Sequence, residues 1–188
     1  MGICGLLALA SAVTYWQVRS PASTALVAPG GSFVMCLPSP GAARGMTTSI
    51  EEVHNRSDQP VRIVKVELLR ATGLRVLGIS ALNYPARRAF GGFGSWNGFP
   101  PRGLPPAWRA AWTRSVPADG AVIPPQAGDE YTGFIIGFAA VRGSGGPLRV
   151  TYEDGEGRRG SVLVHTTLLT SPDCHRPFPG SKGASDFR

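Results

Sequence analysis

The chain has 188 residues, a formal net charge of +7 and three cysteines. Ten basic residues lie between Arg56 and Arg114 against two acidic ones, and the rest of the chain is close to neutral. A segment of one sign attracts anionic surfaces such as lipid headgroups or acidic wall polymers. The alternative is a set of solvated strand edges and loops that keep the domain soluble. Nucleic-acid binding would need a recognised module or aromatics at base-stacking positions, and neither is visible, so nucleic acid is excluded as a partner.

Residues 1–19 form an apolar leader whose first charged residue is Arg19. Spanning a bilayer takes about 20 apolar residues, with ~17 the lower limit, so the leader predicts an N-terminal hydrophobic helix. Tyr15 and Trp16 beside Arg19 match the interfacial anchors of a retained membrane helix, whereas Ser23-Thr24-Ala25 suits the cleavage site of a secretory signal peptide. Both interpretations place the remaining chain outside the cytoplasm, anchored in the cell membrane or secreted. A buried helix of a soluble domain is the third alternative.

Small residues with proline and glycine at both ends make residues 20–31 a predicted linker. Beyond it, Cys36 opens the folded region and Cys174 closes it, while Cys4 belongs to the leader. Two cysteines that bracket one domain in an oxidising compartment predict a disulfide. In the chain-entropy model, closing so long a loop stabilises the fold by about 4–5 kcal/mol. The alternative is two unrelated thiols.

Short apolar runs alternate with turn residues across residues 32–175, which predicts a single all-β sandwich of about seven or eight antiparallel strands. After the turn at residues 55–60, Val64, Val66 and Leu68 alternate with Lys65 and Glu67, so one face of that strand is expected to be apolar. The other strands expected in the first half are Met35–Leu37, Thr47–His54 and Leu74–Leu82.

Residues 130–141 are apolar on both faces, which predicts a central strand covered on both sides. Leu148–Tyr152 and Ser161–Leu169 follow, connected by the loop 143–147 and the turn 154–157, so the three segments predict a meander with short hairpin loops. The last residues, 176–188, are predicted to be a flexible tail.

These features together resemble the immunoglobulin-like β-sandwich, in particular the membrane-anchored or secreted Ig-like domains of actinobacteria. The resemblance rests on the leader, on EEVHNRSDQPVRIVKVEL, and on the series FIIGFAAV, LRVTYEDG and SVLVHTTLL, which together cover about half of the chain. The buried strand-C tryptophan beside an inter-sheet disulfide of antibody domains is not reproduced. The resemblance implies a fold and an extracytoplasmic location, and the fold itself hosts many unrelated functions.

The strand pattern breaks in residues 84–115, a long insertion rich in aromatic residues, arginine, proline and glycine. Residues 106–112 predict one or two helical turns with Trp108 and Trp112 on one face. One interpretation is an Arg-flanked aromatic platform within residues 84–114 that meets a partner, because tryptophan and arginine dominate interface hot spots. The other is an insertion that caps one end of the sandwich with its aromatics inward. The candidate interaction surface comprises Arg87, Arg88, Phe93, Trp96, Trp108, Arg109 and Trp112.

Catalytic and metal-binding patterns are weak. Residues 155–160 match G-x-G-x-x-G, but they fall in a predicted hairpin with no helix to follow, so they do not bind a dinucleotide. A glycine is missing two positions before Ser95, so no hydrolase elbow is formed. Three histidines together with Met35 could hold copper, yet no short ligand spacing joins them; they are His54, His165 and His175. The adjacent carboxylate pairs point to opposite strand faces.

The sequence therefore predicts a non-enzymatic, extracytoplasmic binding or assembly module without cofactor or metal. Its expected partner is another envelope protein or an anionic surface, met through the aromatic insertion. The alternatives are an extracytoplasmic copper-binding protein and the accessory domain of an envelope enzyme complex.

Overall fold

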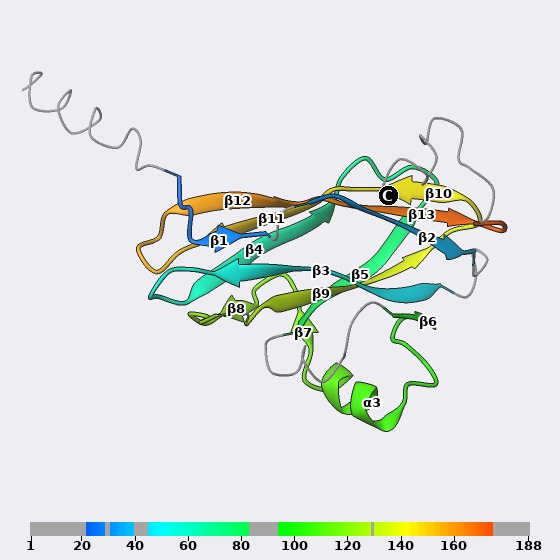
Figure 1. Ribbon diagram of the computed structural model, residues 1–188, viewed down its shortest axis with the longest axis horizontal. Helices are drawn as coiled ribbons and strands as arrows, with labels where there is room; N and C mark the ends of the chain where they lie inside the picture. The colour runs from blue at the N-terminus through cyan, green and yellow to red at the C-terminus, as the bar shows by residue number, and fades with distance from the viewer. Residues whose placement is uncertain (1–21, 29–30, 40–44, 83–93, 129, 175–188) are drawn as a thin grey trace, which may run out of the picture.

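The computed structural model describes residues 22–28, 31–39, 45–82, 94–128 and 130–174 (Figure 1). Among these residues it contains β-strands and one short α-helix. The predicted all-β class is therefore confirmed. The leader and the tail, for which an N-terminal helix and a flexible end were predicted, lie outside the described residues.

One layer is a sheet with the strand order β1-β3-β9-β5-β7, and β6 also pairs with β3. All pairings in this sheet are antiparallel. In Figure 1 it lies below strands β10–β13, and the helix α3 lies below the sheet. The elements of this region are β1 (Leu26–Val27), β3 (Met46–Asn55), β5 (Arg75–Leu82), β6 (Ser95–Asn97), α3 (Pro106–Trp112), β7 (Val116–Pro117) and β9 (Thr132–Ala139).

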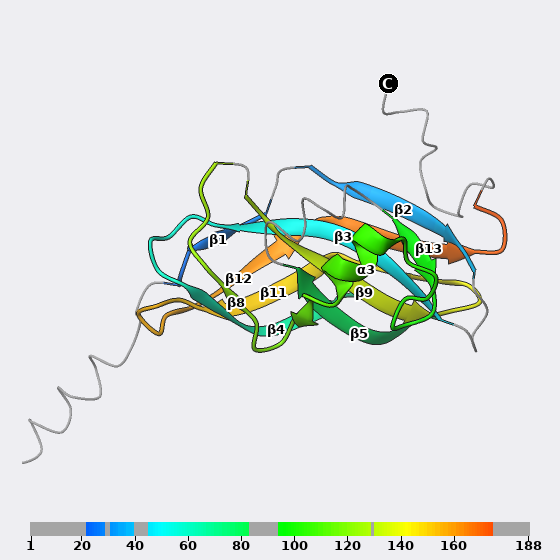
Figure 2. The ribbon, with the colours of Figure 1, turned by 90° about the horizontal axis from the view of Figure 1, so that it is seen from below.

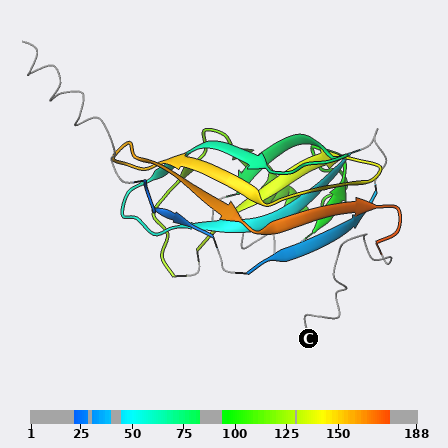
Figure 3. The ribbon, with the colours of Figure 1, turned by 90° about the horizontal axis from the view of Figure 1, so that it is seen from above.

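The opposite layer consists of two sheets with the orders β12-β11-β4-β8 and β10-β13-β2. They are continuous along the chain, since β10 leads into β11 and β12 leads into β13, and Figure 3 shows β12 and β13 following one another in orange. The elements are β2 (Phe33–Pro38), β4 (Val61–Leu68), β8 (Val122–Ile123), β10 (Gly143–Gly145), β11 (Leu148–Glu153), β12 (Arg159–Val164) and β13 (Thr166–Ser171).

The main core lies between the two layers. Phe134, Ile136 and Phe138 of β9 enter it from one side, and Ile63 and Tyr152 enter it from the other, all of them fully buried. This alternation along β9 is what a strand with one face in a core requires. Every residue of β9 is buried, so the predicted central strand covered on both sides is confirmed.

Several details of the predicted strands are wrong. The described residues form thirteen strands instead of seven or eight, because short edge strands carry no apolar pattern of their own. The expected meander is divided between the layers, since β9 pairs with β3 and β5 whereas β11 pairs with β12 and β4.

The loop 143–147 contains β10, because glycine backbone can pair with β13 although it carries no apolar strand pattern. The single strand expected at 161–169 is two strands that are interrupted at His165. In β4 the register against β11 shifts at Val64, which is an extra residue between Ile63 and Lys65. Such a bulge reverses which residues face the core, so Val61 and Ile63 are buried ahead of Val66.

Part of the predicted linker also belongs to the sandwich. We call residues 22–28 and 31–39 the N-terminal arm. Within it Leu26 is buried and pairs with Asn55 of β3. The hydroxyl of Tyr152 donates to the Ser23 carbonyl at 2.8 Å and accepts from the Leu26 N–H at 3.3 Å. The hydroxyl of a buried tyrosine requires hydrogen-bond partners of this kind. Here the partners are backbone groups, so the small residues of the segment give no sign of them in the sequence.

The predicted disulfide between Cys36 and Cys174 is confirmed, with a Cα–Cα distance of 5.6 Å. It ties β2 to the segment that follows β13. Strands β2 and β13 pair in parallel, from Phe33 opposite Thr166 to Pro38 opposite Ser171. The prediction of a purely antiparallel sandwich is therefore wrong at this pair.

Candidate functional site

The described part of the predicted interaction segment, residues 94–114, lies on the outer face of the β9 sheet. We call residues 94–117 the aromatic cover; they include β6, α3 and β7 (Figures 1 and 2). At its start β6 pairs with Met46–Thr48 of β3, and at its end β7 pairs with Ser80 and Ala81 of β5. Both ends of the cover are therefore anchored to strands of the sheet that it covers.

The cover exists because β9 has no polar face. Ile135 and Leu82 point away from the main core and are buried in a second apolar cluster with Ala111 of α3. Three tryptophans pack against this cluster and are themselves half-buried: Trp96, Trp108 and Trp112. Without the cover, the outer side chains of β9 would be exposed to water.

Phe99 lies on a flat area formed by two glycines. Gly78 of β5 and Gly137 of β9 are paired across the sheet. A Cβ atom built on Gly137 would lie 2.1 Å from the Phe99 ring, and one built on Gly78 would lie 2.6 Å from it. The ring therefore occupies the space that two side chains would fill, which is a packing reason for glycine in mid-strand.

The rings of the cover pack edge to face. Trp96 and Trp108 have centroids 4.5 Å apart, and Phe99 and Trp112 have centroids 5.8 Å apart. The predicted helix with Trp108 and Trp112 four residues apart is confirmed. The predicted inward orientation of the aromatics is also found, but the cover lies over a sheet face and not over one end of the sandwich.

The basic residues of the cover remain accessible. Arg109 and Arg114 are exposed, and their guanidinium groups donate to the carbonyls of Leu104 and Ala110 at 3.3 and 3.1 Å. These bonds fix each side chain at the helix surface but leave its charge unneutralised. Trp96, Trp108, Arg109 and Trp112 of the predicted surface are thus brought together, whereas Arg87, Arg88 and Phe93 lie outside the described residues.

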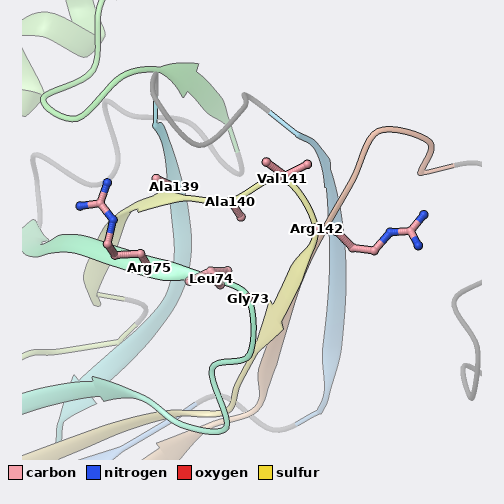
Figure 4. A pocket seen from close by; sticks show the side chains of 7 residues that line it. All are labelled: Gly73, Leu74, Arg75, Ala139, Ala140, Val141 and Arg142. Carbon is pink, nitrogen blue, oxygen red and sulfur yellow. The ribbon is translucent and has the colours of Figure 1, made fainter.

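A shallow hollow of about 490 Å³ lies where β5 and β9 separate, and it was not predicted. It is lined by residues 73–75 and 139–142, just beyond the last pair of the two strands, Arg75 opposite Ala139. Figure 4 shows the side chains of Arg75 and Arg142 pointing to opposite sides and away from the hollow. The two charges therefore do not converge on one small ligand. Hollows of this kind arise from strand divergence, which leaves no pattern in the sequence.

The histidines do not form a metal centre within the part of the chain that the structure describes, where no group of three potential ligands occurs. Nδ1 of His54 lies 2.7 Å from the Glu130 carbonyl, His165 is exposed between β12 and β13, and His175 lies outside the described residues. The G-x-G-x-x-G string spans the turn between β11 and β12, as expected for a hairpin.

Among the described carboxylates, Asp154 has the largest pKa shift, and its hydrogen bonds give it a structural role. Burial alone would raise its pKa, but hydrogen bonds with Ser23, with the backbone N–H groups of Arg158 and Glu156 and with the Arg158 side chain outweigh this effect and lower the pKa to about 2. The carboxylate is buried and holds the β11–β12 turn against the N-terminal arm. Both carboxylate oxygens of Asp154 already accept hydrogen bonds within the fold. The group is therefore not positioned to exchange a proton with a substrate.

No known protein family, curated protein or solved structure matches the chain. In the described residues no helix is long and apolar enough to cross a membrane. Function must therefore be inferred from the fold and the surfaces alone.

Proposed function

We propose that the chain is a non-enzymatic binding module built on an Ig-like sandwich. The order β1-β3-β9-β5 corresponds to the A-B-E-D sheet of that fold, and β12-β11-β4 corresponds to G-F-C. The strands also follow the chain order that this assignment needs, with the aromatic cover inserted between D and E. This correspondence supports an Ig-like fold by topology, whereas the proposed relation to actinobacterial Ig-like domains rests on the sequence features alone.

We place this module outside the cytoplasm, anchored by the leader or secreted after its removal. The closed Cys36–Cys174 bridge supports this location, because disulfides persist in oxidising compartments and are rare in the cytosol. Alkylation of free thiols in intact cells, followed by non-reducing peptide mapping, tests it. Recovery of both cysteines as alkylated thiols would contradict an extracytoplasmic location.

The contact surface we propose is the outer side of the aromatic cover, directed at an acidic face of another envelope protein. One observation carries this choice: residues 94–117 contain Arg102, Arg109 and Arg114 and no acidic residue, and all three arginines are exposed. Arg109 follows Trp108 directly in α3, and the tryptophans of the cover are half-buried against the sheet cluster. Rigid aromatics flanked by arginine favour protein contacts, and a surface of one sign steers a partner of the opposite sign.

In-cell photo-crosslinking tests this surface. A photoreactive residue at Ala110, exposed on α3, is expected to capture a discrete partner that the same residue at Ser161, exposed on β12, does not capture. The substitution Arg109→Glu is expected to abolish the Ala110 adduct while thermal unfolding stays unchanged. Identical adducts from both positions, or an Ala110 adduct that survives Arg109→Glu, would overturn the proposed contact surface.

A further inference from the structure

Strand β2 is one of two six-residue edge strands in the described part of the chain. Among the described residues it pairs only with β13, on one side. The other long edge strand is β12, which among the described residues pairs only with β11. It differs from β2 because it begins with a charged residue, Arg159, whose carbonyl accepts a hydrogen bond from the Ser23 N–H. The remaining margins are strands of two or three residues, namely β1, β6, β7, β8 and β10. Figures 2 and 3 both show β2, in blue, on the outer side of β13, in orange. A six-residue strand without a second neighbour offers its backbone groups to another strand.

The outward backbone groups of β2 can be assigned from its hydrogen bonds. The N–H of Phe33 donates to His165, and the N–H of Ser39 donates to Ser171. Since alternate residues of a strand bond to the same neighbour, Met35 and Leu37 also face β13. Val34, Cys36 and Pro38 therefore direct their backbone groups to the open side, where no strand of the described chain lies. Pro38 has no N–H to offer.

This edge lacks the usual protection by charge. No charged residue occurs between Arg19 and Arg44, although lysine or an inward-pointing charge commonly blocks pairing at exposed edges. Val34 is 60% exposed, more than any other large apolar residue in the described part of the chain. An apolar, uncharged and exposed edge strand is stable in solution when another strand covers it.

We propose that β2 pairs with β2 of a second copy in an antiparallel, two-fold arrangement. Each copy carries a formal charge of +7, so two copies repel each other wherever their arginines meet. Because the β2 edge carries no charged residue, two copies can meet there without this repulsion. For the same reason the edge offers no cation to attract an acidic partner. With Val34 opposite Cys36 of the second copy, each of these residues exchanges both backbone hydrogen bonds.

The geometry also limits the size of the assembly. In the described chain each β2 has one open side, and a two-fold pair uses both open sides, so association through β2 ends at the dimer. In the same register Pro38 falls at the end of the paired segment, where its missing N–H matters least. The aromatic cover lies on the other layer and stays accessible, so this inference does not depend on the proposed function.

Sedimentation equilibrium of the full chain with its disulfide closed tests the proposal. We expect a reversible monomer–dimer equilibrium whose dissociation constant rises at least tenfold in Val34→Lys. The matched control is Val141→Lys, because Val141 is 57% exposed outside β2; its dissociation constant is expected to equal that of the unsubstituted chain. A chain that stays monomeric up to hundreds of micromolar, or a dimer unaffected by Val34→Lys, would overturn the proposal.

Amide hydrogen exchange of the unsubstituted chain gives a test that no variant can confound. The amides of Val34 and Cys36 are expected to be protected only at concentrations where the dimer forms. The amides of Phe33, Met35 and Leu37, which face β13, are expected to be protected at every concentration and serve as the internal reference. Protection of Val34 and Cys36 that does not change with concentration would show that the edge is not closed by a second copy.

Discussion

The N-terminal arm and the aromatic cover both border strand β3 but are attached in different ways. β1 of the arm pairs with the Asn55 end of β3, and β6 of the cover pairs with the Met46 end. The arm is held by a disulfide and by buried polar groups, namely the Tyr152 hydroxyl and the Asp154 carboxylate. The cover is held by the packing of its aromatic rings: Phe99 lies over Gly78 and Gly137, and the tryptophans pack against the second apolar cluster.

This difference determines which solution conditions each attachment senses. A disulfide responds to reductant and a carboxylate responds to pH, whereas ring packing responds to neither. Reduction or acid should therefore loosen the arm before the cover. The following substitutions separate the two attachments.

Removal of the disulfide should have the largest effect. Cys36→Ser with Cys174→Ser opens a loop with a sequence separation of 138 residues, and we expect the free energy of unfolding to fall by about 3 to 5 kcal/mol. Urea unfolding followed by far-ultraviolet circular dichroism measures this change. Dithiothreitol should lower the stability of the unsubstituted chain to the same level and leave the double variant unchanged. Equal urea midpoints for the two chains would contradict the role of the bridge.

Loss of the Phe99 ring should have the next largest effect, and it should be confined to the cover. Phe99→Ala empties the space over Gly78 and Gly137, and because the ring is only half-buried we expect a loss of about 2 to 3 kcal/mol. The loss should be the same with and without dithiothreitol. A loss that disappears on reduction would mean that the cover and the arm unfold as one unit.

Two glycines provide a matched pair that perturbs one attachment at a time. Gly137→Ala forces a Cβ into the Phe99 ring, and Gly160→Ala forces one to 2.4 Å from the Ser23 carbonyl and 2.5 Å from Cζ of Tyr152. Overpacking of this kind costs about 1 to 3 kcal/mol at each site.

The readout for this pair is the near-ultraviolet circular dichroism of the tryptophans, three of which belong to the cover. It should change in Gly137→Ala and stay constant in Gly160→Ala, although both variants lose stability. A changed tryptophan signal in Gly160→Ala would show that the arm and the cover are coupled through β3.

The contrast between the two regions also explains how much could be predicted from the sequence. The cover was partly predictable, because a strand such as β9 with no polar face needs a second apolar layer, and the helical spacing of Trp108 and Trp112 supplied part of one. Of the arm, only the Cys36–Cys174 bridge and the strand around Cys36 were predictable, and the attachment of residues 22–28 was not. This attachment depends on Tyr152, which is 126 residues away from Leu26, and on backbone groups that any small residue supplies.

The same reasoning applies to details inside the strands and to the candidate surface. The bulge at Val64 reverses an alternation that looks regular in the sequence, and β10 is made of glycine and serine. Neither produces an apolar signal. In the interaction surface, Phe99 packs over Gly78 and Gly137 and contacts Trp112. The pairing of the two glycines is set by the sheet register, which the local sequence pattern does not show.

The smallest effect we predict is a pH-dependent one at Asp154. Its pKa in the folded chain, about 2, lies below the ordinary value of 3.8, so the ionised carboxylate stabilises the folded state. This contribution is fully present above about pH 4 and is lost as the pH falls toward 2. Asp154→Asn should therefore lower the free energy of unfolding at pH 7, and the difference from the unsubstituted chain should shrink between pH 4 and pH 2. Since Asp154 bonds to Ser23 and not to the cover, the tryptophan signal of the folded variant should match that of the unsubstituted chain. A stability difference that stays constant down to pH 2 would contradict this account. It would mean that the amide of the Asp154→Asn variant cannot form the hydrogen bonds of the carboxylate for steric reasons, and that the charge of the carboxylate does not stabilise the arm.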